Sequence, residues 1–267
     1  MMDPLLVANR ERHAFMKAPE PIEGTSRTAF QQALEANPYA QALATPVRQC
    51  QLSRTRLPSQ FLVPFVTELP AVNRESIDGK DATAKPRIAP AIAFKSNRPK
   101  SYLLATEEAM RSMGGRKGKW PLLVNDRMKR PYALRARKSM DSVKVHREWV
   151  CDKDGLVDRV REQLRQVVKR NLKRCLLEGK DSETPLLVPL PADGAAQTQD
   201  FICTLRVGEQ EITDRHGDGK RRQEYGLDQQ EFGDLLDSSM TGEFGVVRHK
   251  TTAYLIMALE RYRNFGA

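Results

Sequence analysis

The sequence contains few aromatic residues and no long apolar run. Phe, Trp and Tyr make up 6% of the 267 residues, and no segment matches the aromatic signature of an RNA-recognition motif. No stretch approaches 18 consecutive apolar residues, so neither a transmembrane helix nor membrane insertion is predicted. With 29% charged residues and a mean hydropathy of −0.57, the composition is typical of a chain that can bury a core but has little apolar surplus.

The four cysteines stand far apart, at Cys50, Cys151, Cys175 and Cys203. There is neither a CxxC pair nor a dense disulfide framework, so a reducing compartment is expected. Residues 1–24 mix acidic with basic side chains and lack a long apolar run. Neither a secretory signal nor a mitochondrial transit peptide is therefore expected there.

Catalytic motifs are also missing. The histidines (His13, His146, His216 and His249) are isolated from one another, and no GxSxG elbow, HExxH helix or GxGxxG turn occurs. His146 and Cys151 lie five residues apart, but no second pair completes a zinc site. We therefore predict a protein that is not an enzyme, with no metal, cofactor or small-molecule substrate.

Positive charge, in contrast, is abundant in one part of the chain. Residues 85–180 carry 26 Lys and Arg against 10 Asp and Glu, a net charge of +16, whereas the other residues carry 18 and 24, a net charge of −6. A segment charged in this way repels itself unless a polyanion or counterions neutralise it. Nucleic-acid phosphate is the commonest such partner, so we predict contact with RNA or DNA. A solvated basic surface is the alternative.

The N-terminal third is predicted to be extended, with one short helix over residues 26–36. Ser26 or Thr25 can cap that helix, and Asn37-Pro38 ends it, because proline disfavours helical geometry in the preceding residue. Residues 45–70 combine four prolines with regularly spaced apolar anchors. This pattern fits either a chain laid across another surface or a buried core strand.

The middle of the chain is predicted to mix short helices and strands. We expect a helix over 102–113, strands over 120–124 and 132–137, and a strand over 143–150, in which apolar and polar residues alternate. Residues 71–100 have the composition of a polar linker.

The strongest single prediction is a basic amphipathic helix over residues 156–178, with an apolar stripe opposite five cations. Asp154 is its expected N-cap, and Gly179 is expected to follow its C-terminus. Beyond it we predict a strand over 201–207, a short helix over 228–236 and a final helix over 251–263. The fold class is therefore α+β, divided into an extended segment 1–70, a linker 71–100 and an RNA-contacting domain 101–267.

Three basic patches carry the predicted RNA contacts. The first is a glycine-rich loop at 111–119, which does not have the spacing of a nucleotide-binding P-loop. The second covers 129–138, and the third is the polar face of the long helix. Their expected role is to neutralise and position phosphate, and the candidate residues are Arg116, Lys117, Lys119, Lys129, Arg130, Arg135, Arg137, Lys138, Lys169, Arg170 and Lys173.

Three short stretches resemble a known family. Asn37-Pro38-Tyr39-Ala40, Ala44-Thr45-Pro46-Val47-Arg48-Gln49-Cys50 and Leu57-Pro58-Ser59-Gln60-Phe61-Leu62 resemble fungal mitochondrial ribosomal proteins, above all accessory proteins of the small subunit. The resemblance implies a structural rRNA-binding component of the mitochondrial ribosome in the matrix, with ribosomal proteins as neighbours. It carries no active-site residue.

Two other functions are open at this point. One is a scaffold that binds proteins in a large complex without touching RNA, and the other is a nucleic-acid-modifying enzyme. Either is compatible with a cytoplasmic or nuclear location as well as a mitochondrial one.

Overall fold

The computed structural model describes residues 28–69, 85–93, 97–114, 118–151, 155–181, 185–190, 201–207, 223–227, 232 and 242–266. The chain divides into two units, with the boundary between Leu34 and Glu35. Helix α2 (Ala29–Glu35) is the helix predicted over 26–36. Its N-terminus is a capping box, because the Gln31 N–H donates to Thr28 Oγ1 at 3.3 Å and the Thr28 N–H donates to Gln31 Oε1 at 3.0 Å. The predicted caps, Thr25 and Ser26, lie outside the described residues.

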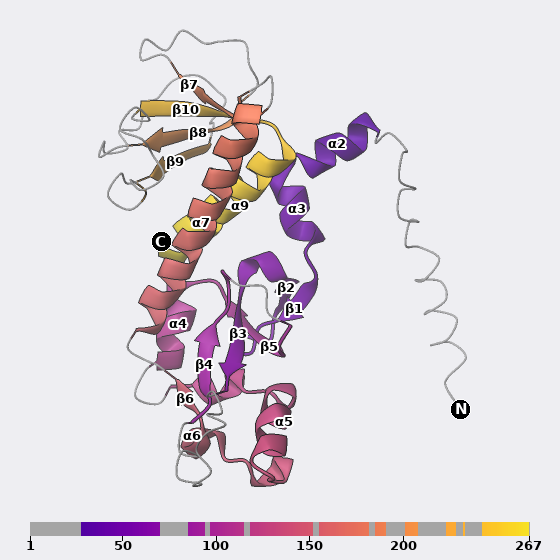
Figure 1. Cartoon of the computed structure of the whole chain (residues 1–267), viewed down its shortest axis with the longest axis vertical. Coiled ribbons are helices and arrows are strands. Elements are labelled where there is room, and N and C mark those ends of the chain that lie inside the picture. The colour runs from indigo at the N-terminus through magenta and orange to yellow at the C-terminus, as the bar shows by residue number, and fades with distance from the viewer. Residues whose placement is uncertain are drawn as a thin grey trace, which may run out of the picture. The chain divides into compact units, whose positions relative to one another are not determined.

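The second unit is mixed α and β, which confirms the predicted fold class (Figure 1). Its elements in chain order are α3 (Pro38–Ala44), β1 (Val47–Gln49), β2 (Arg56–Pro58), the 3₁₀ turn η1 (Ser59–Phe61), β3 (Leu62–Glu68), β4 (Arg87–Pro90), β5 (Lys100–Leu104), α4 (Glu107–Gly114), η3 (Trp120–Leu123), α5 (Asp126–Arg135), η4 (Met140–Ser142), α6 (Val145–Glu148), β6 (Val150–Cys151), α7 (Leu156–Asp181), β7 (Leu187–Pro189), β8 (Phe201–Val207), β9 (Gln223–Leu227), β10 (Gly242–Val247) and α9 (Lys250–Gly266).

The first four-stranded sheet has the order β5-β3-β4-β6. Strand β3 pairs antiparallel with both β4 and β5, and β4 pairs parallel with β6. Leu62, Val63 and Phe65 of β3 are fully buried, so the second half of the segment 45–70 is a core strand, whereas the anchors Val47 and Phe61 are exposed. Segments predicted as an extended arm and a linker therefore contribute strands to the folded body.

The middle of the chain is more helical than predicted. Residues 100–104 form β5 rather than the start of a helix, while 120–123, 126–135 and 145–148 form η3, α5 and α6 in place of the predicted strands. Asn125 explains α5, because its side-chain oxygen accepts the Met128 N–H at 3.0 Å and caps the helix. The alternating patterns covered only five to eight residues, and such short apolar runs do not separate helix from strand.

The second four-stranded sheet has the order β7-β10-β8-β9, with β8 and β9 parallel and β10 antiparallel to both β7 and β8. The predictions for 201–207, 156–178 and 251–263 are confirmed by β8, α7 and α9. Gly179 lies inside α7 rather than after it, and a Cβ there would meet the backbone nitrogen of Leu186 at 3.3 Å. The predicted cap Asp154 and most of the helix predicted over 228–236 lie outside the described residues.

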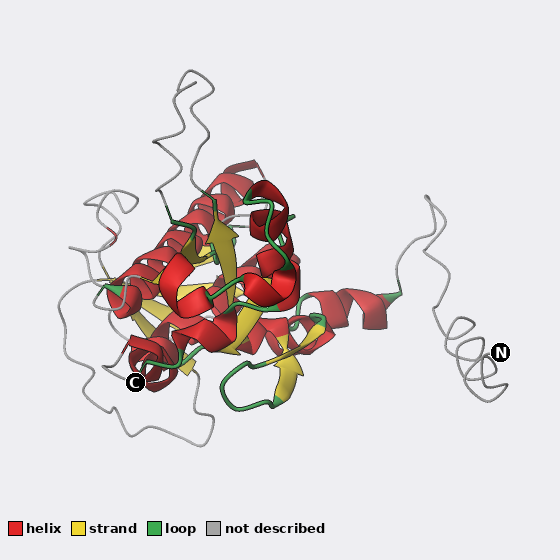
Figure 2. Cartoon of the chain, turned by 90° about the horizontal axis from the view of Figure 1, so that it is seen from below, coloured by secondary structure: helices red, strands yellow, loops and turns green. Residues whose placement is uncertain are grey.

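Helices α7 and α9 connect the two sheets (Figures 1 and 2). The first half of α7 packs in one hydrophobic core with the β3 sheet, and its second half packs in another core with the β10 sheet. Helix α9 contributes to both cores in the same way, through Phe265 to the first and Leu255 to the second. The two sheets are therefore packed on one shared pair of helices.

Candidate nucleic-acid interface

Nine of the predicted RNA-binding residues are described by the structure, and they fall into two groups. Six lie in residues 118–149, which we call the basic end, and three lie on α7. Arg116 and Lys117 lie outside the described residues. The basic end carries nine Lys and Arg against three Asp and Glu, and it comprises η3, α5, η4 and α6.

Helix α5 is fixed at both ends and along one face. Its cap residue Asn125 also donates from Nδ2 to the Lys100 carbonyl at 3.3 Å, which ties the helix to β5. Met128 and Ala133 are buried, and Tyr132 packs edge-on against Trp149, with ring centroids 4.5 Å apart. The helix therefore presents its opposite face to solvent from a rigid support.

The exposed face of α5 carries cations. Arg127, Arg130 and Leu134 are all exposed and follow the i, i+3, i+7 spacing of one helix face. Lys129 forms an ion pair with Asp126 at 2.9 Å. Among the cations of the basic end, those that are exposed and form no ion pair with a described carboxylate are Lys119, Arg127, Arg130, Arg137, Lys144 and Arg147.

The C-terminus of α5 is a Schellman motif. The Lys138 N–H donates to the Ala133 carbonyl at 2.9 Å, and the Arg137 N–H donates to the Leu134 carbonyl at 3.3 Å. Arg137 has the left-handed conformation that this motif requires, with φ of 52°. Glycine is usual at that position because a Cβ is strained there. The chain thus keeps a cation where backbone geometry favours glycine.

Replacing Arg137 with glycine is therefore expected to stabilise the protein. Relief of the left-handed strain raises the free energy of unfolding by about 1 kcal/mol, measured by urea unfolding. Ala136→Gly is the matched control, because Ala136 has helical geometry with φ of −81°, and glycine there costs about 0.5–1 kcal/mol. A loss of stability in Arg137→Gly would contradict this account of the turn.

Glu148 holds the two helices of the basic end together. Its carboxylate accepts hydrogen bonds from the Lys144 backbone N–H at 3.1 Å and from Lys138 Nζ at 3.0 Å. It also forms a hydrogen bond with the Tyr132 hydroxyl. Desolvation opposes ionisation, but these three hydrogen bonds together lower the pKa of Glu148 below its ordinary value. The pKa of Tyr132 is raised to about 12, mainly by desolvation and to a smaller extent by its hydrogen bond to the negatively charged Glu148. Glu148 thus neutralises Lys138 while it orders α6.

Glu148→Gln is expected to lower the free energy of unfolding at pH 7 by about 1–2 kcal/mol, because charged hydrogen bonds are weakened. The folded-state pKa of Glu148 is lowered. Its stabilising effect is therefore present above the unfolded pKa of about 4.3 and is lost as the pH falls through the folded value. The difference between wild type and variant should shrink from pH 7 to pH 3 in urea unfolding. Asp141→Asn, at an exposed acid, is the matched control and should change the free energy of unfolding at pH 7 by less than about 0.5 kcal/mol.

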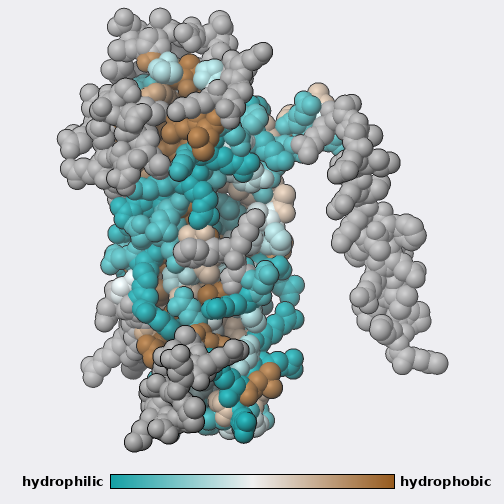
Figure 3. All heavy atoms as spheres, viewed as in Figure 1, coloured by the Kyte–Doolittle hydropathy of each residue, from teal (hydrophilic) through white to brown (hydrophobic). Residues whose placement is uncertain are grey.

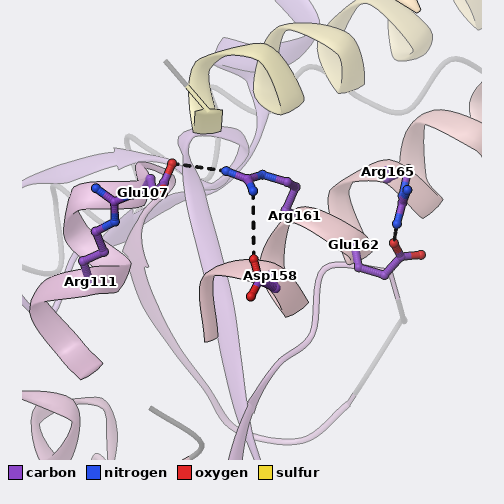
Figure 4. Close-up of polar contacts among 6 residues, drawn as sticks. All are labelled: Glu107, Arg111, Asp158, Arg161, Glu162 and Arg165. Atoms are coloured by element: carbon purple, nitrogen blue, oxygen red, sulfur yellow. Dashed lines mark hydrogen bonds and ion pairs between the residues drawn. The ribbon is translucent and has the colours of Figure 1, made fainter. Parts of the chain in front are cut away.

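The cations of α7 are mostly engaged within the protein. Arg161 pairs with Glu107 at 3.3 Å and with Asp158 at 3.9 Å, and Arg165 pairs with Glu162 (Figure 4). Arg174 pairs with Glu178 at 2.7 Å. On the face drawn in Figure 3, hydrophilic residues cover most of the described surface over α7. Much of its basic face therefore forms ion pairs along the helix.

The three predicted residues on α7 differ from one another. The Arg170 guanidinium donates to the Ala93 carbonyl at 2.8 Å, and Lys169 lies 6.0 Å from the centre of the Phe232 ring. Lys173 is exposed. The structure places this group beside the second core, about 20 Å along α7 from Leu156, at a rise of 1.5 Å per residue. It does not join the basic end.

Sequence reasoning missed the outward cation Arg127 and the exposed pair Lys144 and Arg147. Arg127 lies three residues before Arg130, a helical spacing that was overlooked because that segment was interpreted as a turn between strands.

Burial raises the pKa of the Cys175 and Cys203 thiols to about 12, so both are protonated at neutral pH. Within the described ranges, no cluster of three or more metal-ligating side chains occurs, and no helix there has the length and apolarity to cross a membrane.

A family model described as "Required for respiratory growth protein 8 mitochondrial" matches residues 15–188, well over half of the chain. The chain belongs to that family. The match includes the whole basic end and all of α7. Because the family is mitochondrial, the predicted mitochondrial location is confirmed, whereas ribosomal identity stays a prediction. No curated protein and no solved structure is significantly similar to the chain.

Proposed function

We propose that this mitochondrial protein is a structural, non-catalytic RNA-binding component of the mitochondrial ribosome, and that its basic end lies against rRNA in the matrix. The observation that carries the proposal is the set of exposed cations on and beside α5, which have no described carboxylate partner. Planar guanidinium donors match the oxygens of phosphate, and exposed cations of this kind contact the backbone of nucleic acids.

The expected mode of contact is backbone recognition rather than base stacking. Trp120 and Trp149 are 7% and 3% exposed, and Tyr132 packs on Trp149. Aromatic platforms for unpaired bases need exposed rings, which these residues do not offer. We therefore expect the protein to recognise the shape and charge of a structured RNA.

The proposal is tested by native co-sedimentation with mitochondrial ribosomal particles, followed by crosslinking to locate the contacted RNA. Crosslinks are expected at α5 and α6. With about six phosphates engaged, the log–log slope of RNA affinity against salt is expected near −4 to −5. Sedimentation as free protein, without crosslinks in residues 118–149, would contradict the proposal.

A protein-binding scaffold is the second candidate, favoured by one observation. Leu134 lies on the outward face of α5, near its C-terminus, and is 74% exposed, and Leu122 in η3 is 43% exposed. A partner protein would bury such residues. Association that survives ribonuclease and depends little on salt, but is lost in Leu134→Ser, would favour the scaffold over RNA binding.

A further inference from the structure

A pocket of about 310 Å³ lies between α3, η1 and α9, away from the basic end. Its walls are mainly apolar, with side chains from Pro38, Ala42, Phe61, Leu104, Ile256 and Met257. We call it the α9 pocket. Its volume is at the lower end of the range of about 300–1,000 Å³ that is typical of small-molecule sites. The pocket therefore suits a small ligand with a largely hydrocarbon body.

One cation, Arg261, lines this pocket and also a second cavity of about 160 Å³ on the side of α7. Its guanidinium donates to the Leu62 carbonyl, while its Nε is buried without a hydrogen-bond partner. No described carboxylate forms an ion pair with it. Burial lowers the pKa of Arg261 to about 10, so the side chain is still charged at neutral pH.

Arg261 is half-buried, and its buried Nε has given up hydration without gaining a hydrogen bond or an opposite charge. The neighbouring acid does not supply that charge. Glu260 accepts the Tyr225 hydroxyl at 2.5 Å and the Asn264 amide at 3.3 Å. The Glu260 carboxylate is therefore engaged by these two donors. Its negative charge at the pocket disfavours a ligand that carries two negative charges.

We propose that the α9 pocket binds an amphipathic monocarboxylate, with its carboxylate on Arg261 and its short hydrocarbon body against Phe61, Leu104 and Ile256. A carboxylate matches the planar donors of a guanidinium, and the apolar walls match an alkyl chain. The site shares no residue with the basic end, so the proposal is independent of RNA binding.

The test is isothermal titration of the full-length protein with octanoate, and in parallel with 1-octanol and octyl phosphate. Octanoate is expected to bind at least tenfold more tightly than 1-octanol, since only the acid compensates Arg261. It is also expected to bind more tightly than octyl phosphate, which brings a second negative charge toward Glu260. No octanoate binding at millimolar concentration, or equal binding of acid and alcohol, would overturn the proposal. Preference for octyl phosphate would overturn the assignment to a monocarboxylate.

Arg261→Met provides the decisive variant, because it keeps the length of the side chain and removes the charge. It is expected to weaken octanoate binding at least tenfold, with 1-octanol binding unchanged, and to raise the melting temperature without ligand. Arg56→Met, which removes an exposed cation of β2 outside the pocket, is the matched control and should bind octanoate like the wild type. Unchanged octanoate binding in Arg261→Met would overturn the proposal. If that variant does not fold, Ala42→Phe, which fills the pocket, should abolish binding, and retained binding there would equally overturn it.

Discussion

Replacing Arg127, Arg130 and Arg137 together with glutamine is expected to lower affinity for mitochondrial rRNA on the order of a hundredfold at about 0.1 M salt, because each lost phosphate contact gives up released counterions. The salt dependence reports the number of contacts directly. We expect the log–log slope to become less steep by about three, one unit for each cation removed. Fluorescence anisotropy of a labelled rRNA fragment over a range of salt concentrations measures both quantities.

A triple variant on α7 separates a site from a general charge effect. Arg161, Arg165 and Arg174 are each paired with a carboxylate in the protein, so their replacement by glutamine changes the net charge by the same amount. We expect that variant to keep most of the wild-type affinity and slope, with its folding verified by circular dichroism. Equal losses in the two triple variants would indicate diffuse electrostatic attraction and would remove the basic end as the binding site.

The second large effect concerns the coupling of the two cores. Leu205 is 1% exposed in the second core, and Leu205→Ala is expected to cost about 2–5 kcal/mol. Both tryptophans, Trp120 and Trp149, lie in the first core. Because α7 and α9 pack in both cores, we expect Leu205→Ala to shift unfolding seen by tryptophan fluorescence as much as unfolding seen by far-ultraviolet circular dichroism.

The reciprocal variant and a surface control complete this test. Phe265→Ala removes a fully buried ring from the first core and should cost about 3–5 kcal/mol in the same single transition. Leu134→Ala, at an exposed position, should change stability by less than about 0.5 kcal/mol. A fluorescence transition that is untouched by Leu205→Ala would show that the two cores unfold independently.

Long periodic patterns predicted their elements well. The apolar stripe of α7 gave a correct helix, because it extends over enough residues to separate a helical from an extended period. Short alternating patterns were less informative: the seven residues of β8 form the predicted strand, but a second pattern of similar length does not. The alternation from Val143 to Val150 predicted a strand, whereas Glu148 accepts the Lys144 N–H and a helical turn forms there instead. That contact is specific to one side chain and is invisible to periodicity.

The candidate site was predicted in part for the same reason. Arg130 and Arg137 follow from the local density of basic residues, which is a property of composition. Arg127 does not, because its alignment with Arg130 depends on α5 being a helix. The ion pair between Arg161 and Glu107 joins residues 54 positions apart, so no local pattern indicates it. The pairs of Arg165 and Arg174 follow the i, i+3 and i, i+4 spacing of a helix and could have been found in the sequence.

The sequence by itself determined the α+β class, the long helix and the concentration of positive charge in one part of the chain, since these depend on composition and on local periodicity. Only the tertiary structure decided which cations are left without a carboxylate, that α7 and α9 belong to both cores, and that Arg261 lies half-buried beside an apolar pocket. Each of these depends on residues brought together from distant parts of the chain, and the energies of burial and charge pairing are set by those neighbours.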